Sequence, residues 1–409
     1  MFTDSFHELN GVGTLSREFV NFAQRNNLTF CCVYGGASTQ AKREGSLLRL
    51  QLKRSSASFP VDQGLYCDPL LSRYRNRVLD QLRSFDPDII HITGPGDMGI
   101  LGFWVSHSLK RPLAASWHTN LHEYAARRLE KMFSFAPCPL RNRVTSAAES
   151  QILRALMSFY GLAHFIFAPN VAMVDMLQAW TQRPSYRMSH GVDFIRFSPT
   201  RRAGTNECFQ IGYVGRLTPE KNVRSFAELE RRLVAAGQTN FRMLLVGDGS
   251  EREWLQRNLR FADLPGVLLG DSLAAAFAGM DAFVFPSGTD TFGLVVLEAM
   301  ASGVPVIVGK QAGARVEVSD GVAGFVADDF TEGVLRLMSC GSLRRRMGEE
   351  ARRFAVSKGW CGVFEDVYRT YDLALSRDEV RRRMNPRVID ADGSHALETI
   401  AGRDNITIR

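Results

Sequence analysis

Two acidic residues, Asp290 and Glu298, stand at the two ends of a short segment that ends in an apolar run. The apolar residues 282–287 before it predict a strand, and the apolar residues after Gly293 predict a helix. The first backbone N–H groups of that helix, near Gly293 and Leu294, and its positive dipole end would face the turn. A helix start of this kind binds phosphate, and the flanking carboxylates can hold hydroxyls. The segment therefore predicts a pocket for a nucleotide sugar.

A second motif, Phe209–Asn222, combines a buried strand with a turn that contains two cations. Gly215 lets the chain pass close to a ligand, and Thr218 is a plausible helix N-cap. Arg216 and Lys221 flank this helix start, where two cations suit a diphosphate leaving group whose charge grows as its bond breaks. For this motif taken alone, an ordinary capped helix with exposed cations is an equal alternative.

Two weaker candidates lie in the first half of the chain. Gly13 ends a Gly-Val-Gly turn before the expected helix Leu15–Gln24 and can lie beside phosphate, although such turns are common. His118 follows the expected strand Leu113–Trp117 and is a candidate site residue, with a hydrogen-bonded structural histidine as the alternative. Asp86-Pro-Asp88 resembles a metal-binding pair but precedes a strand, so we interpret it as a turn and predict no metal site.

The composition is that of an ordinary globular protein, with 45% apolar and 23% charged residues in 409 positions and a net charge of +7. This length predicts two domains. Seven unpatterned cysteines indicate reduced thiols in a cytoplasmic protein, and no apolar stretch is long enough for a membrane helix. The arginine runs lack interleaved aromatic residues, which favours solvated helix faces over a nucleic-acid surface.

Short apolar runs alternate with helical patterns along nearly the whole chain. Continuous apolar runs predict strands that are covered on both faces, and their alternation with helices predicts parallel sheets. The expected fold class is α/β, with two facing Rossmann-like domains. The predicted strands are Leu28–Tyr34, Leu47–Leu52, Ile89–Thr93, Leu113–Trp117, Phe165–Ala168, Tyr186–Ser189, Phe209–Val214, Phe241–Val246, Val267–Leu269, Ala282–Phe285, Pro305–Val308 and Phe325–Ala327.

The polar segment 197–206 predicts the linker between the domains. We expect an N-terminal domain at 1–196, completed by a helix at about 361–378, and a C-terminal, donor-binding domain at 205–360. The charged segment 379–409 predicts a disordered tail. Only Met1-Phe2 precede the first loop, so the first strand of the N-terminal domain is expected to be missing.

Together these motifs resemble the retaining glycosyltransferases of family 4, which have the GT-B architecture. The specific parts of the resemblance are Gly212–Asn222 and Asp290–Val306, and weaker support comes from Asn10–Thr14, His118 and His190-Gly-Val-Asp193. One departure is that the first acid of the paired motif is usually glutamate, whereas here it is Asp290.

The resemblance implies a role for each candidate residue and no metal. The diphosphate would be bound by Arg216 and Lys221, and near the phosphates would lie Gly13, Gly215, Gly293 and Leu294. Glu298 would hold the ribose hydroxyls. Asp290 would contact the transferred sugar, and His118 would lie near the reacting sugar.

The sequence thus predicts a cytoplasmic enzyme that moves a hexose from a UDP- or GDP-sugar to a hydroxyl acceptor with retention and without a cofactor. The resemblance favours lipid or glycolipid acceptors. The basic, partly apolar segment Tyr124–Arg143 indicates contact with the inner membrane face, with a solvated helix as an equal alternative. A non-catalytic nucleotide-sugar-binding protein and a nucleotide-sugar epimerase remain the alternative functions.

Overall fold

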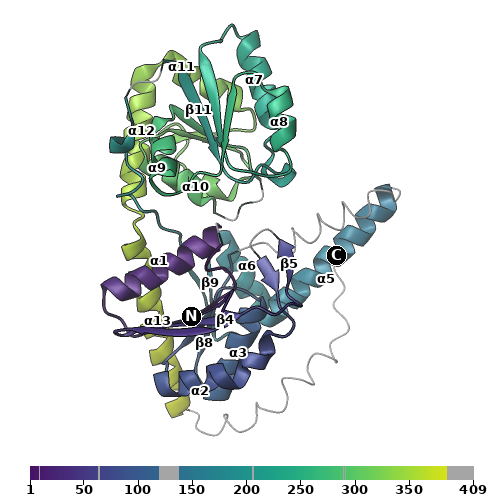
Figure 1. The fold of residues 1–409 in the computed structure, drawn as a ribbon, viewed down its shortest axis with the longest axis vertical. Coiled ribbons are helices and arrows are strands. Elements are labelled where there is room, and N and C mark those ends of the chain that lie inside the picture. Colours follow the sequence, from purple (N-terminus) through teal and green to yellow (C-terminus); the bar gives the residue numbers. More distant parts are fainter. Residues whose placement is uncertain are drawn as a thin grey trace. The chain divides into compact units, whose positions relative to one another are not determined.

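The structure is a computed structural model, and it describes residues 1–8, 10–62, 65–118, 138–204, 207–288, 290 and 292–384. The chain forms two compact units, Met1–Glu365 and Asp366–Arg409. The first unit contains two large β-sheets, each flanked by helices (Figure 1). The predicted α/β class with two Rossmann-like sheets is therefore confirmed.

The N-terminal sheet has eight strands, and all neighbours are parallel except the edge pair β3–β4. Its buried strands are short apolar runs, as parallel strands covered on both faces require. A separate antiparallel pair, β5 (Phe59–Asp62) and β6 (Leu65–Cys67), lies outside this sheet. The order across the eight-stranded sheet is β10 (Ser185–Arg187), β9 (Phe165–Ala168), β8 (Leu113–Ser116), β7 (Ile90–Ile92), β1 (Phe2–Thr3), β2 (Phe30–Gly36), β4 (Leu47–Lys53) and β3 (Gln40–Glu44).

The first strand is present, and the prediction that it is missing was wrong. Strand β1 has only two residues, yet it occupies the central position between β7 and β2. The amino group of Met1 donates to the Cys31 carbonyl at 2.6 Å, and the Thr93 N–H donates to the Phe2 carbonyl at 3.0 Å. A strand this short suffices because its backbone groups bond to both neighbours and the Phe2 side chain is buried.

Helix α1 begins at Gly11, earlier than the predicted Leu15, because the Asn10 side chain caps it by accepting from the Gly13 N–H at 2.8 Å. Its apolar side chains pack inward, including Phe19. The other helices of this part are η1 (Leu71–Tyr74), α2 (Arg75–Phe85), α3 (Asp97–Leu109), α5 (Cys138–Tyr160) and α6 (Val171–Thr181).

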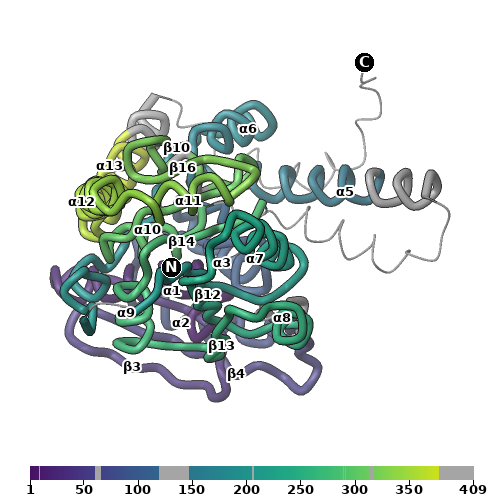
Figure 2. Tube along the Cα trace, turned by 90° about the horizontal axis from the view of Figure 1, so that it is seen from above, coloured from purple at the N-terminus to yellow at the C-terminus, as the bar shows by residue number. Residues whose placement is uncertain are grey.

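The C-terminal sheet has six strands, all parallel, and forms the larger hydrophobic core. Helices α10, α11 and α12 pack together beside it (Figure 2). Its strand order is β13 (Ala262–Gly266), β12 (Phe241–Val246), β11 (Phe209–Val214), β14 (Ala282–Phe285), β15 (Val306–Val308) and β16 (Gly324–Val326). The helices are η2 (Pro199–Arg201), η3 (Pro219–Lys221), α7 (Ser225–Ala235), α8 (Arg252–Asn258), α9 (Gly270–Gly279), α10 (Leu294–Ala301), η4 (Gly313–Glu317), α11 (Phe330–Ser339), α12 (Gly341–Val356) and α13 (Trp360–Met384).

Edge strands account for two further differences from the sequence prediction. The predicted strand Val267–Leu269 lies beyond the end of β13, and the side chains of Val267 and Leu269 are 55% and 56% exposed. Strand β3 was not predicted, because its residues Gln40–Glu44 are polar and mostly exposed. An edge strand is covered less than a central one, so its apolar signal is weak.

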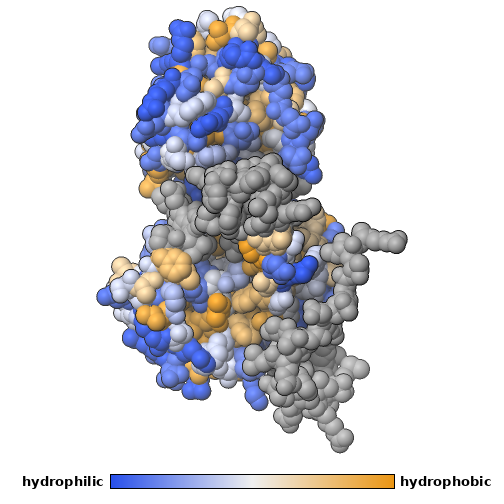
Figure 3. Space-filling view, turned by 90° about the vertical axis from the view of Figure 1, so that its right-hand side faces the viewer, coloured by the Kyte–Doolittle hydropathy of each residue, from blue (hydrophilic) through white to orange (hydrophobic). Residues whose placement is uncertain are grey.

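The arginine runs of the sequence are not uniformly solvated, since Arg352 is partly buried and donates to the carbonyls of Phe197 and Ala301. Helix α7 has a solvated face that carries two other arginines. On α7, Glu228 pairs with Arg231 at 2.6 Å and with Arg232 at 2.5 Å, all on its outer side. The visible face of the C-terminal sheet domain is mostly hydrophilic (Figure 3). No helix among the described residues is both long and apolar enough to cross a membrane.

Two predicted segments lie wholly or partly outside the described residues. Residues 124–137 of the segment Tyr124–Arg143 are not described, and α5 begins at Cys138. Helix α13 continues to Met384, into the segment predicted as a tail, and residues 385–409 are not described.

Candidate active site

The site begins where strands β11 and β12 end side by side. Gly215 and Gly247 have positive φ angles of 155° and 140°. A Cβ atom on Gly247 would lie 1.9 Å from the Gly215 carbonyl oxygen, and the Gly215 N–H donates to the Val246 carbonyl at 3.0 Å. The glycines therefore let the two loops pack against each other. This contact directs the chain after β11 into the turn that carries the predicted cations.

Lys221 and Asp290, predicted separately, form an ion pair. The Lys221 ammonium donates to Asp290 Oδ1 at 2.5 Å, and the lysine is 8% exposed. The second oxygen, Asp290 Oδ2, is buried and has no hydrogen-bond partner among the described residues. Buried polar atoms in proteins are almost always satisfied, so an open carboxylate oxygen beside a buried cation indicates where a ligand hydroxyl would bind.

Arg216 lies in the same turn but has a different partner. Its guanidinium is 3.5 Å from Glu220, whose carboxylate also accepts from the Thr218 hydroxyl at 2.7 Å. The Arg216 carbonyl accepts from the buried Tyr213 hydroxyl at 2.9 Å, which fixes the backbone of the turn. Thr218 has the extended conformation of an N-cap, but its side chain bonds to Glu220 rather than to the backbone.

Helix α10 starts at Leu294 and ends at Ala301, as the sequence predicted. Its N-cap, Gly293, has φ 79° and no side chain that could bond to the first N–H groups. These N–H groups carry the positive end of the helix dipole and suit a phosphate. A Cβ atom on Gly11 would lie 3.4 Å from Leu294 Cδ1, so the first residue of α1 lies close to this helix start.

Glu298 lies one turn into α10 and is the second acid of the pair. Burial raises the pKa of its carboxyl to about 7; nearby Asp193 also raises it, while Arg196 lowers it. The group therefore titrates close to neutral pH. An ionised carboxylate accepts hydrogen bonds from ribose hydroxyls more strongly than a protonated one.

His118 lies just beyond strand β8 and is buried beside a second histidine, His190. The two rings are 5.7 Å apart between centroids and nearly perpendicular, at 76°. Burial lowers the pKa of His118 to about 4 and that of His190 to about 3. Both imidazoles are thus neutral at physiological pH, when each carries one donor and one acceptor nitrogen.

Gly13 is held by contacts with the segment just before it. It lies in the first turn of α1, where its N–H already donates to the Asn10 side chain. A Cβ atom on Gly13 would lie 2.4 Å from the Glu8 carbonyl oxygen. Close backbone packing is a sufficient reason for glycine at this position.

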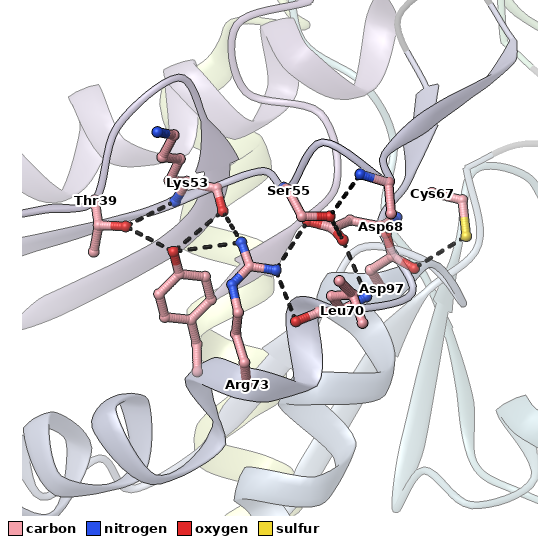
Figure 4. Close-up of polar contacts among 10 residues, drawn as sticks. Thr39, Lys53, Ser55, Cys67, Asp68, Leu70, Arg73 and Asp97 are labelled. Carbon is pink, nitrogen blue, oxygen red and sulfur yellow. Dashed lines mark hydrogen bonds and ion pairs between the residues drawn. The ribbon is translucent and has the colours of Figure 1, made fainter.

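A second polar cluster lies in the N-terminal domain around Asp68 (Figure 4). The Asp68 carboxylate accepts from the Ser55 N–H and hydroxyl, both at 2.6 Å, from the Leu70 N–H at 3.0 Å and from Arg73 at 3.5 Å. Its own N–H donates to Asp97. Both carboxylate oxygens are therefore satisfied within the protein, and the cluster connects the end of β6 to the loop after β4.

The described residues contain no group of three histidine, cysteine or acidic side chains that could hold a metal ion. Asp86 has the left-handed conformation of a helix C-cap and pairs with Arg111 at 2.5 Å. This placement agrees with its interpretation as a turn residue.

The structure thus connects three of the predicted residues through two chains of contacts. Lys221 contacts Asp290, and His118 contacts His190, whose ring stacks on Phe292 with centroids 4.4 Å apart. Sequence reasoning gave no role to His190 or Phe292. Their signal was weak, because a single aromatic residue at a loop is usually part of the core.

The fold and the site define a class of protein: two Rossmann-like sheets, with a helix start suited to a phosphate and two nearby carboxylates in the C-terminal domain. Comparison with solved structures supports the fold. Sucrose-phosphate synthase from Thermosynechococcus elongatus matches with a TM-score of 0.68 and 15% identity, over 92% of this chain and 96% of that one. HepE from Anabaena, in complex with UDP-glucose, matches with a TM-score of 0.61 and 16% identity, over 91% and 98% of the two chains.

The sequence comparisons identify the family. Residues 9–196 match the model described as Glycosyltransferase Family 4, and residues 200–354 match that of Glycosyl transferases group 1. A GDP-mannose-dependent alpha-mannosyltransferase of Mycolicibacterium smegmatis is 32% identical over 75% of this chain and 79% of its own length. Sulfoquinovosyl transferase SQD2 of Arabidopsis thaliana is 28% identical over 71% of this chain and 58% of its own.

The chain therefore belongs to glycosyltransferase family 4. It is a retaining hexosyltransferase that takes its sugar from a nucleotide-sugar donor, as the resemblance implied. Family membership favours this activity over the alternatives of a non-catalytic binding protein and an epimerase.

Proposed function

We propose that this enzyme transfers mannose from GDP-mannose to a hydroxyl acceptor. The observation that carries the proposal is the identity of 30% or more to GDP-mannose-dependent alpha-mannosyltransferases over about three quarters of this chain. The sequence alone left the base open between UDP and GDP. The similarity to these relatives favours GDP.

We assign the donor contacts to the C-terminal site residues. The N–H groups at Gly293 and Leu294 bind the diphosphate together with Arg216 and Lys221. Glu298 holds the ribose hydroxyls. Asp290 Oδ2 accepts a hydrogen bond from a hydroxyl of the transferred sugar, and the support for this contact is that the oxygen is buried and has no partner. His118 lies on the sugar side, and Gly13 and Gly215, which have no side chains, let the chain pass close to the phosphates.

In the proposed reaction, the bond between the anomeric carbon and the diphosphate oxygen breaks while the acceptor oxygen bonds to the same face of that carbon. The acceptor proton passes to the departing phosphate oxygen. Lys221 and Arg216 stabilise the charge that grows on the diphosphate. No separate strong base is then required, which agrees with neutral, weakly basic imidazoles at His118 and His190.

The donor assignment is tested by calorimetry of the full chain with GDP, GDP-mannose, UDP and UDP-glucose. GDP-mannose should bind at least about tenfold more tightly than UDP-glucose, a difference of about 1.4 kcal/mol. Tighter binding of UDP-glucose would overturn the assignment of the base while leaving the family unaffected. Mannose transfer to a lipid extract then tests the reaction itself.

We further propose a membrane-lipid acceptor and peripheral contact of the cytoplasmic enzyme with anionic lipid. The support is the cluster of arginines and apolar residues in the sequence segment Tyr124–Arg143. Flotation with vesicles of phosphatidylcholine, with and without phosphatidylglycerol, tests this contact. Binding should require the anionic lipid and weaken with salt, and equal recovery with both vesicles would contradict it.

We also propose the boundaries of the two domains. Residues 1–196 form the acceptor-side domain, which a helix at about 361–378 completes, and residues 205–360 form the donor domain. Stacking of Phe364, at the start of α13, on Phe19 of α1 supports this return of the chain, with ring centroids 4.5 Å apart.

A further inference from the structure

His190 is a buried histidine of the site region to which neither the sequence motifs nor the proposed reaction gives a role. It follows strand β10 and is 4% exposed. Its Nδ1 atom is buried and has no hydrogen-bond partner in the part of the chain that the structure describes. A buried imidazole nitrogen without a partner costs free energy, so its persistence requires an explanation.

The backbone beside His190 is held rigidly. The Val192 N–H donates to the Lys358 carbonyl at 2.9 Å, and Val192 bridges to Gly359. A Cβ atom on Gly191 would lie 2.7 Å from the Trp360 ring, so the chain packs directly on this indole. His190 therefore projects from a fixed segment and not from a loose loop.

The ring of His190 is also fixed on two sides. It stacks on Phe292 with an interplanar angle of 29°, and it meets the ring of His118 nearly at a right angle. Phe292 lies between Asp290, whose Oδ2 also lacks a partner, and Gly293, the N-cap of α10. Two buried polar atoms without a partner among the described residues thus occur near Phe292: Asp290 Oδ2, two residues earlier in the chain, and Nδ1 of the His190 ring that stacks on it.

We propose that His190 is a further substrate-binding residue, whose Nδ1 atom forms a hydrogen bond with a hydroxyl of the transferred sugar while Phe292 holds the ring in place. This inference rests on the proposed function and adds to it. The transferred sugar would then form hydrogen bonds with two buried atoms, Asp290 Oδ2 and His190 Nδ1. The nucleoside diphosphate itself has no share in the His190 contact.

This difference between sugar and nucleotide sets the test. Three variants separate the nitrogen from the ring: His190→Phe keeps the stacking and removes the nitrogen, His190→Asn keeps a polar group near the Nδ1 position, and His190→Ala removes both. His107→Phe on the exposed side of α3 is the matched control. For each, calorimetry compares the affinity for the sugar nucleotide with that for its nucleoside diphosphate, using GDP and GDP-mannose or, where the wild type prefers them, UDP and UDP-glucose.

We expect His190→Phe to lower the affinity for the sugar nucleotide by about three- to tenfold, the range of one neutral hydrogen bond, and to leave the affinity for the diphosphate unchanged. His190→Asn should restore part of the loss. If His190→Phe binds the sugar nucleotide as tightly as the wild type does, the role of His190 is overturned, while the proposed function stands. The same holds if the variant loses equal affinity for the sugar nucleotide and for the diphosphate. A wild-type protein that binds neither pair would overturn the proposed function as well.

Discussion

Asp68 and Asp290 are two carboxylates that follow strands, β6 and β14, and each is paired with a cation, but their surroundings differ. Asp68 is fully buried, and both of its oxygens accept hydrogen bonds from the protein. Asp290 has one oxygen on Lys221 and one with no partner. The first cluster is complete without a ligand, whereas the second leaves an acceptor open. The difference separates a group that stabilises the fold from one arranged for a substrate.

The pKa of Asp68 reflects its complete environment. Burial would raise this pKa, but the hydrogen bonds from Ser55 and Leu70 and the charge of Arg73 outweigh it, so the pKa lies below its ordinary value. A carboxyl whose pKa is lower in the folded state than in the unfolded state stabilises the fold at pH values above its unfolded pKa. This stabilisation is lost as the pH falls through its folded pKa. The Asp68 cluster therefore stabilises the N-terminal domain at neutral pH.

The largest effect is expected at the Lys221–Asp290 ion pair. Replacing Lys221 with methionine removes the cation that stabilises the leaving diphosphate and should lower kcat/KM by about a hundredfold. The melting temperature should change little, because the freed Asp290 remains partly accessible to water. Lys310→Met is the matched control, since Lys310 is exposed and pairs only with an exposed aspartate. Equal activities of the two variants would remove the distinction between the clusters.

A substitution in the Asp68 cluster should lower stability and leave donor binding unchanged. Asp68→Ala leaves the Ser55 and Leu70 N–H groups without an acceptor and should lower the free energy of unfolding by about 2 kcal/mol. Donor affinity should be retained. Urea unfolding and calorimetry measure the two quantities, with Asp80→Ala on the exposed face of α2 as the control, expected within about 0.5 kcal/mol of the wild type. A loss of donor binding without a loss of stability would assign Asp68 to the site instead.

The smallest effect concerns Glu298 and pH. Because its pKa is raised to about 7, the carboxylate is mostly protonated at pH 6 and ionised at pH 8. Affinity for the sugar nucleotide should therefore rise by about fivefold between these values, as a charged acceptor bonds more strongly than a neutral one. The raised pKa affects folding stability in the opposite direction. The contribution of the Glu298 carboxyl to the free energy of unfolding is complete below the unfolded pKa of 4.5 and is lost as the pH rises through 7.

Glu298→Gln separates this titration from the histidines. His118 and His190 are neutral throughout this pH range because burial lowers both pKa values well below 6. The variant should therefore bind the donor with an affinity independent of pH between 6 and 8. A pH dependence that survives the substitution would show that another group is responsible.

The sequence predicted the C-terminal domain better than the N-terminal one. Strands β11, β12 and β14 and helix α10 have the predicted boundaries, since each is a mainly apolar segment. The edge strands β3 and β13 were missed or misplaced because exposure removes the apolar signal. Strand β1 was thought absent because two residues give no periodicity, although its hydrogen bonds to β2 and β7 are enough to define it.

By itself, the sequence determined the residues whose chemistry is carried by local motifs: Lys221 after β11, and Asp290, Gly293 and Glu298 around the start of α10. A turn and the helix that follows it are defined by neighbours in the chain, so spacing alone places such groups. Only the tertiary structure decided that Lys221 pairs with Asp290 and that His190 lies between His118 and Phe292. Those contacts join residues far apart in sequence, and packing, rather than spacing, determines which buried polar atoms are left without a partner.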